Sequence, residues 1–159
     1  MEKERLQEFA ARVSQANRSE LVVVIYDAAI VSIEEGKSCL EKDDITAARK
    51  EIDRAKGMVD ELLHSLDLKY QISHYLRQLY IYAYRELCQG IALRDADRLD
   101  HASDVLKGLL PSFREVAKQD ESGPVMENTQ QIYAGLTYGR DSLDETIAVG
   151  VNFNRGFEA

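Results

Sequence analysis

Glu61 and His64 come nearest to a chemical site, because they form a Glu-x-x-His step inside a helical segment. Four-helix bundles that bind two irons use two such steps together with a glutamate from each remaining helix. The second step is missing here, since glutamine and arginine stand three residues before the other two histidines, His74 and His101. We therefore interpret Glu61 and His64 as a solvated surface pair, and we keep a metal-dependent bundle enzyme only as a weak alternative.

Tyr26 and Asp27 could be imagined as an acid and base pair. Asp27 is better explained as a residue at a polar edge, or as one that binds a neighbouring backbone group. The sequence contains no G-x-S-x-G, P-loop or G-x-G-x-x-G motif. We therefore expect no catalytic centre and no cofactor.

Residues 72–91 are rich in aromatic and aliphatic side chains and predict a helix with a wide apolar arc. We assign Leu76, Leu79 and Ala83 to the stripe that faces the core. A second set lies on a different face, and two further tyrosines flank the stripe: Tyr80, Tyr84, Leu87 and Ile91, then Tyr75 and Tyr82. The surplus could form a groove for an amphipathic partner helix, since tyrosine buries its ring while its hydroxyl stays wet. It could equally be covered by other parts of the chain, and both interpretations stay open.

The remaining elements are also predicted to be helical. Residues 3–14 have the spacing of a short amphipathic arm. Asn17 and Glu20 form a capping box that begins a helix reaching Leu40, although Val22-Val23-Val24-Ile25 looks like a strand. Because this helix is apolar on all sides, it should be central to the bundle.

Three further helices follow. Asp43-Asp44 caps a helix whose apolar residues recur strictly at intervals of three and four up to Leu66. The next helix is expected to follow Asp67. After a turn at residues 95–97, the last helix runs toward residue 119, with a kink or break at Pro111.

Short connections between long helices imply antiparallel neighbours, so the fold class is all-α. We predict an antiparallel up-down four-helix bundle with an N-terminal helical arm in residues 1–120. We expect Leu62, Leu76 and Leu106 to be buried where the helices meet.

Residues 121–159 are predicted to be a C-terminal extension of short helices and coil, packed on the bundle or on a partner. Helical pieces are expected at 126–134 and after the capping box of Ser142 and Glu145. Residues 120–159 carry seven acidic and two basic residues, together with scattered aromatics. The extension could complete the core, occupy the partner groove, or recruit another protein.

The composition limits the classes of partner. The chain has 159 residues and a net charge of −8, with no run of lysine and arginine. Such a surface repels phosphate backbones, so we expect no nucleic-acid partner. Cys39 and Cys88 match no metal or redox spacing, which suits a reducing cytoplasm. The most apolar stretch, residues 21–33, is too short and too polar to cross a bilayer, so we expect no membrane segment.

Several segments taken in order resemble the flagellin export chaperone family, small cytoplasmic proteins that hold flagellin before secretion. The resemblance covers residues 13–119 and is carried by four runs: Glu20-Leu21 through Tyr26-Asp27, Asp43-Asp44, Arg54-Ala55 through Ser65-Leu66, and Leu79-Tyr80-Ile81-Tyr82. The sequence departs from the family pattern at Arg18, where proline is usual, and at Ala28, where glycine is usual.

The resemblance implies a chaperone that wraps the C-terminal segment of flagellin and prevents premature polymerisation. It implies no ATP and no catalytic residue. Flagellar export gate components are further candidate partners, and the chaperone is expected to be a monomer or a homodimer. The wide apolar arc and the family together suggest seven partner-binding residues: Phe9, Tyr26, Ile30, Tyr80, Tyr82, Tyr84 and Leu87. The alternative is a paralogous helical adaptor for another export or regulatory protein.

Overall fold

The computed structural model describes residues 1–126 of the chain. The chain divides into two units, Met1–Val125 and Met126–Ala159. The predictions for the C-terminal extension, including its two short helices, lie outside the described residues.

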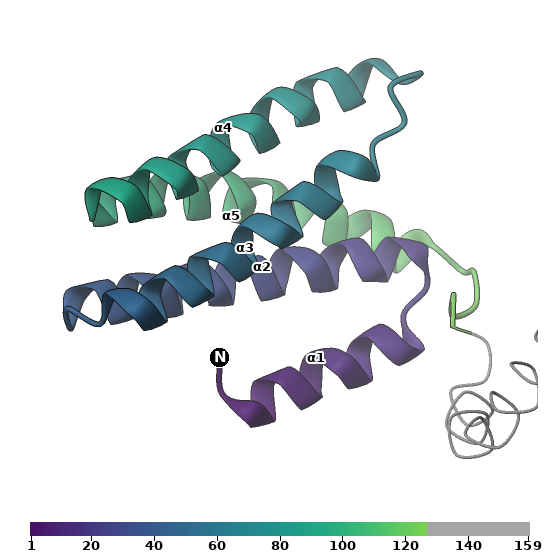
Figure 1. Ribbon diagram of the computed structural model, residues 1–159. Helices are drawn as coiled ribbons and strands as arrows, with labels where there is room; N and C mark the ends of the chain where they lie inside the picture. Colours follow the sequence, from purple (N-terminus) through teal and green to yellow (C-terminus); the bar gives the residue numbers. More distant parts are fainter. Residues whose placement is uncertain (127–159) are drawn as a thin grey trace, which may run out of the picture. The chain divides into compact units, whose positions relative to one another are not determined.

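In the described residues, all the regular structure is helical, and this confirms the predicted all-α class (Figure 1). The structure has five helices in this part of the chain: α1 (Lys3–Gln15), α2 (Arg18–Glu41), α3 (Ile45–His64), α4 (Gln71–Leu93) and α5 (Ala96–Gln119). The helices α2 to α5 form a ring of neighbours, because α2 packs on α3, α3 on α4, α4 on α5, and α5 on α2. The chain reverses direction at each connection between them, as Figure 1 shows.

Helix α2 begins where its capping box predicts. The Asn17 side chain accepts a hydrogen bond from the Glu20 amide at 2.8 Å, and the Glu20 carboxylate accepts one from the Asn17 amide at 2.9 Å. These two bonds satisfy backbone donors that a helix start leaves unpaired. The valine run is helical and contributes Val23 and Val24 to the buried residues. The predicted central position of this helix is confirmed, since α2 contacts α1, α3 and α5.

The core lies inside the ring of four helices. Leu62 and Leu106 are buried there as predicted, at 1% and 0% exposure. Leu76 is only partly buried at its edge, which corrects the prediction for this residue. Burying a leucine side chain removes about 1.5–3 kcal/mol of apolar hydration cost, so these contacts dominate the stability of the bundle.

Helix α4 differs from the prediction at its start. Its N-cap is Tyr70, whose side chain makes no capping bond, and not Asp67. The Asp67 carboxylate instead accepts a hydrogen bond from the Lys69 amide at 3.0 Å, within the turn that precedes the helix. Asp67 therefore stabilises the connection between α3 and α4, and the helix starts one turn later.

The face that α4 turns toward the core also differs from the prediction. The buried stripe is Ser73, Tyr80, Ala83, Leu87 and Gly90. Leu79, which we assigned to the core, is 38% exposed. Two stripes at three- and four-residue spacing run side by side on this helix. The one with small residues is buried, because serine and glycine let the helices approach closely.

Helix α5 continues through Pro111 to Gln119, so the predicted break at this proline is wrong. Proline removes one backbone donor and leaves the carbonyl of residue i−4 unpaired. Both Pro111 and Lys107, the residue four positions earlier, are exposed. Water can therefore bind the unpaired carbonyl, and the helix need not end.

After α5, residues 120–125 return to the junction between α1 and α2. The Asn17 side-chain amide donates to the carbonyl oxygens of Asp120 and Ser122, at 3.2 and 3.3 Å. The Val125 amide donates to the Ala16 carbonyl oxygen at 3.1 Å. These bonds attach the end of α5 to the start of α2.

Candidate partner-binding site

Helices α4 and α5 are joined closely at the end of the bundle where the chain turns between them. The Glu86 carboxylate on α4 accepts a hydrogen bond from Arg98 of α5 at 3.0 Å, and its second oxygen lies 2.9 Å from His101 Nδ1. A Cβ at Gly90 would lie 2.6 Å from Leu99 Cδ2, so only glycine allows this approach. This end of the α4–α5 pair is therefore tightly packed.

The helix face that carries Glu86 is left uncovered toward the start of α4. Residues three and four apart share a helix face, so Glu86 continues a stripe formed by Ile72, Tyr75, Leu79 and Tyr82. Exposure is 42% at Tyr82 and 38% at Leu79, and it rises to 58% at Tyr75 and 63% at Ile72. The apolar stripe thus becomes more exposed as it leaves the closed end.

Helix α5 shows the same trend on the face that meets Glu86. One face carries Arg98, then Val105 and Leu109, and then Val116 at the spacing of a helix. Val105 and Leu109 are half-buried against the core, whereas Val116 is 55% exposed. At the end of the bundle away from Glu86, the α4 stripe and the neighbouring face of α5 are therefore both exposed to solvent.

A pocket of about 430 Å³ opens at this same end between α2, α3 and α5. Its apolar lining is Leu21, Val22, Ile25, Phe113 and Val116. We call the combined surface the α4–α5 face. It consists of the α4 stripe, of Leu109 and Val116 on α5, and of the apolar lining of this pocket. Its residues are Ile72, Tyr75, Leu79, Tyr82, Leu109, Val116, Leu21, Val22, Ile25 and Phe113. Large apolar side chains that are exposed on one helix face are typical of a protein–protein interaction site.

An aromatic cluster lies in the core beneath the α4–α5 face. The Tyr26 and Tyr80 hydroxyls hydrogen-bond to each other, and the Tyr26 ring lies 5.0 Å from that of Phe113. Burial raises the pKa of both tyrosines, because a phenolate would lose its hydration there. The cluster links α2, α4 and α5 and fixes the base of the surface.

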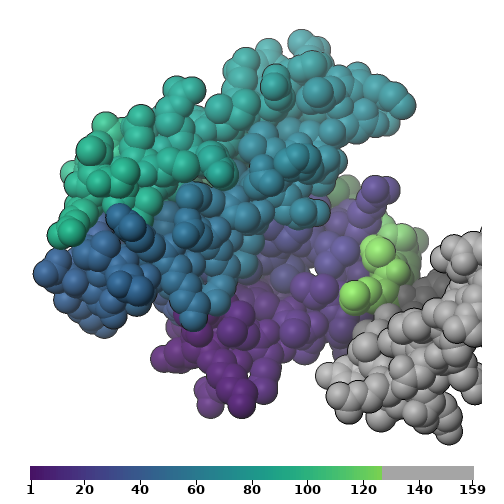
Figure 2. Space-filling model, viewed as in Figure 1, coloured from purple at the N-terminus to yellow at the C-terminus, as the bar shows by residue number. Residues whose placement is uncertain are grey.

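Charge is unevenly distributed along α4. From Leu68 to Arg85 the sequence has no acidic residue, although the whole chain has a net charge of −8. Lys69, Arg77 and Arg85 are exposed, and none of them forms an ion pair within the described part of the chain. Figure 2 shows that α4 lies on the outside of the bundle, so these cations are open to a partner.

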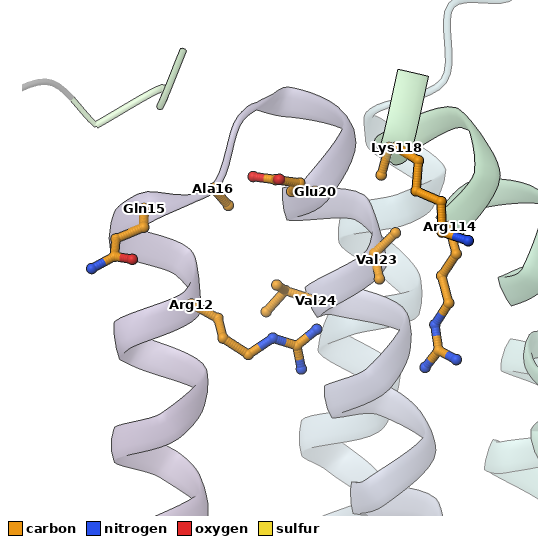
Figure 3. Close-up of a pocket in the computed structure, with 9 residues that line it drawn as sticks. Arg12, Gln15, Ala16, Glu20, Val23, Val24, Arg114 and Lys118 are labelled. Carbon is orange, nitrogen blue, oxygen red and sulfur yellow. The ribbon is translucent and has the colours of Figure 1, made fainter. Parts of the chain in front are cut away.

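A second candidate surface lies where the arm α1 meets α2 and α5. A cavity of about 370 Å³ is lined by Phe9 of α1 and Ile30 of α2, among others. A neighbouring cavity of about 500 Å³ is lined by Arg12 of α1 and Arg114 of α5, whose side chains Figure 3 shows extending from the two helices. Asp27 of α2 binds both arginines, at 2.7 and 2.9 Å.

The seven residues suggested by the sequence do not form one surface. Phe9 and Ile30 line the arm cavity, and Tyr82 belongs to the α4–α5 face. Tyr84 is half-buried against the core. The other three, with exposures of 0–1%, are core residues that offer no open surface in this conformation: Tyr26, Tyr80 and Leu87. Their contact with a partner remains a prediction.

Ile72 and Leu79 were not identified as surface residues from the sequence, because they lie at the spacing expected of a core-facing stripe. Seven of the twelve exposed large apolar residues of the described chain fall within residues 68–82. The available signal was the second stripe at Ser73, Tyr80 and Leu87, which competes with the first. The absence of any acidic side chain in this segment was a further signal.

The metal alternative finds no support from the placement of His64. Its side chain is 75% exposed, and its Nδ1 atom lies 2.8 Å from the Asp60 carbonyl oxygen of the same helix. Within residues 1–126, no group of three or more histidine, cysteine or acidic side chains is arranged to hold a metal ion.

Among the residues that the structure describes, no helix combines the length and the apolar character needed to cross a bilayer.

Comparison with known proteins assigns the chain to a family. The profile described as "Flagellar protein FliS" matches residues 1–120. A flagellar secretion chaperone FliS of Bacillus subtilis (strain 168) is 25% identical over 107 residues, which are 67% of this chain and 77% of the relative. The predicted resemblance is confirmed, and the chain belongs to the FliS family of flagellar secretion chaperones.

Proposed function

We propose that this chaperone binds the C-terminal segment of flagellin and keeps it from polymerising before flagellar type III secretion. The observation that carries the proposal is the α4–α5 face, where four large side chains of α4 are 38–63% exposed beside an apolar pocket. Exposed apolar side chains that are gathered on one helix face often mark an interaction site. Membership of the FliS family makes flagellin the leading client.

The mode of action is binding without catalysis. An amphipathic segment of the client lays its apolar side on Ile72, Tyr75, Leu79 and Tyr82, in the manner of a helix in a groove. Its terminal residues enter the pocket between α2, α3 and α5. Buried apolar area supplies the affinity, and the ordering of the client opposes it. The segment cannot self-associate while this side is covered.

The proposal includes the cellular location of the protein and its additional partners. A cytoplasmic chaperone of this kind hands its client to the export gate, so gate components are additional partners. It works without a cofactor, nucleic acid or membrane. The seven residues derived from the sequence keep a place in the proposal. Tyr82 contacts the client directly, and Tyr26, Tyr80 and Leu87 support the surface from below. The other three stay predicted contacts: Phe9, Ile30 and Tyr84.

Calorimetric titration with the C-terminal segment of flagellin from the same organism tests the proposal. We expect one site per chain. Tyr75→Ala and Leu79→Ala should each weaken binding about tenfold, which corresponds to about 1.4 kcal/mol. Both side chains are exposed, so the fold should tolerate the substitutions.

Leu93→Ala is the matched control for these variants. Leu93 is 65% exposed near the other end of the same helix, beyond Glu86. Its truncation should leave the affinity within about twofold, since residues away from the interface contribute little. No heat with any C-terminal flagellin segment would overturn the proposal. A screen of other export substrates would then test the adaptor alternative.

A further inference from the structure

We infer that the partner segment bound on the α4–α5 face is an acidic amphipathic helix, recognised by Lys69 and Arg85 at the two ends of the α4 stripe. The inference rests on the proposed use of this face. It adds the charge of the partner, which the family assignment does not give.

Lys69 and Arg85 flank the α4 stripe in the sequence. Lys69 precedes Ile72 by three residues, and Arg85 follows Tyr82 by three residues. Lys69 lies in the turn that precedes α4, and Arg85 lies on α4 itself, so the two cations bracket the apolar stripe along the chain. A helix that covers the stripe therefore places its own end residues near Lys69 and Arg85.

Lys69 and Arg85 differ in their ion pairing from most cations of α1 and α5. Most of the described arginines and lysines of α5 and α1 bind carboxylates, for example Arg98 to Glu86 and Arg12 to Asp27. Lys69 and Arg85 are exposed and take part in no ion pair among the described residues. On a chain with a net charge of −8, the unpaired Lys69, Arg77 and Arg85 lie in a segment without acidic residues, where they create a local positive field that attracts acidic partners.

A second copy of the chain is a poor occupant of this face. Antiparallel pairing of two α4 stripes would be centred at residue 77 and would align Ile72 with Tyr82. The same register brings Lys69 of one copy opposite Arg85 of the other at both ends. Like charges placed together across an interface cost free energy, so an acidic helix fits better than another α4.

Two synthetic peptides of 18 residues test the inference against the full chain. Both carry leucines at three- and four-residue spacing, and they differ only in end residues that are glutamate in one and lysine in the other. Fluorescence anisotropy should show that the acidic peptide binds at least tenfold more tightly at low salt. The difference should shrink at high salt, because exposed charges are screened.

Charge-reversal variants locate the effect. Lys69→Glu combined with Arg85→Glu should remove or invert the preference. Arg49→Glu combined with Lys50→Glu is the matched control, since it changes the net charge equally at exposed positions of α3. The control should keep the preference.

Three outcomes would overturn the inference: equal binding of the two peptides, no saturable binding of either, or an equal response to the two double variants. Sedimentation that revealed a dimer dissociated by Tyr75→Ala would assign the face to a second copy instead. Failure here is distinct from failure of the proposed function. Flagellin could bind the face without charge preference, and an acidic helix could bind it when flagellin does not.

Discussion

Tyr26 and Tyr80 hydrogen-bond to each other through their hydroxyl groups at the centre of the bundle, although 54 residues separate them in sequence. Their exposures are 0% and 1%, so each hydroxyl depends on the other for a partner. The pair connects α2 with α4 directly beneath the α4–α5 face.

The costs of removing the two hydroxyls of this pair should not add. Tyr80→Phe leaves the buried Tyr26 hydroxyl unpaired and should cost about 1–3 kcal/mol, the penalty of an unsatisfied buried group. The double variant Tyr26→Phe/Tyr80→Phe should cost clearly less than the sum of the two single variants. Urea unfolding of the three variants measures these free energies. Strict additivity would show that the hydroxyls do not depend on each other.

Truncation of the core should follow the burial of each leucine. Leu62→Ala should lower the free energy of unfolding by about 2–5 kcal/mol, by lost transfer energy and a residual cavity. Leu93→Ala, at an exposed position, should change it by no more than about 0.5 kcal/mol. Thermal melts compare the two, and a Leu62→Ala melt that matched the wild type would place Leu62 outside the core.

The beginnings of α2 and α3 could be predicted from the sequence because each depends on local chemistry. Asn17 and Glu20 satisfy one another within four residues, and Asp44 caps the Ala47 amide at 3.0 Å. The apolar residues of α3 recur strictly at intervals of three and four, which likewise defines a single buried face. Leu62 could therefore be placed in the core. Such features need no knowledge of distant segments.

The orientation of α4 could not be predicted in this way. Ile72 and Leu79 are as apolar as Tyr80 and Leu87, so hydrophobicity alone favours neither stripe. The choice depends on the approach of Leu99 to Gly90 and on the bond of Tyr80 to Tyr26, both of which are made by other helices. The candidate site depends on this choice, and for this reason its exposed residues were not all recognised.

The pH dependence of the junction between α5 and α2 is set by Asp120. Hydrogen bonds from Ser122 and Ser19 lower the pKa of this carboxyl from 3.8 to about 2. A depressed pKa means that the contribution to stability is fully present above about pH 4 and is lost as the pH falls through 2. NMR titration of the Asp120 carboxyl should give a midpoint near 2.

The two serines provide the control for this titration. In Ser19→Ala/Ser122→Ala the side-chain donors are gone, and the pKa of Asp120 should move back toward 3.8. An Asp120 midpoint that was the same in both proteins would show that the serine hydroxyls do not hold the carboxylate.

Two glycines within helices should respond oppositely to alanine. At Gly90 an added Cβ would lie 2.6 Å from Leu99 and 3.2 Å from the Asp95 carbonyl oxygen, so overpacking of about 1–3 kcal/mol should outweigh the better helix propensity. At Gly108 nothing lies within 4 Å, and alanine should stabilise α5 by about 0.5–1 kcal/mol. Chemical denaturation of both variants measures the change in the free energy of unfolding. Changes of the same sign in the two variants would contradict the close packing at Gly90.

The attachment of the arm should depend on Asp27. Helix α1 has no buried residue, and Asp27 connects it to the bundle by binding Arg12 of α1 and Arg114 of α5. In Asp27→Asn both arginines lose their counter-charge, so α1 should open more often while the core keeps its stability. Hydrogen exchange of residues 3–15 should become several-fold faster, and exchange in α3 should not change. Glu34→Gln is the matched control, because it removes an ion pair with Lys107 that does not involve α1. Equal acceleration in both variants would show that net charge, and not the Arg12–Asp27–Arg114 contact, holds the arm.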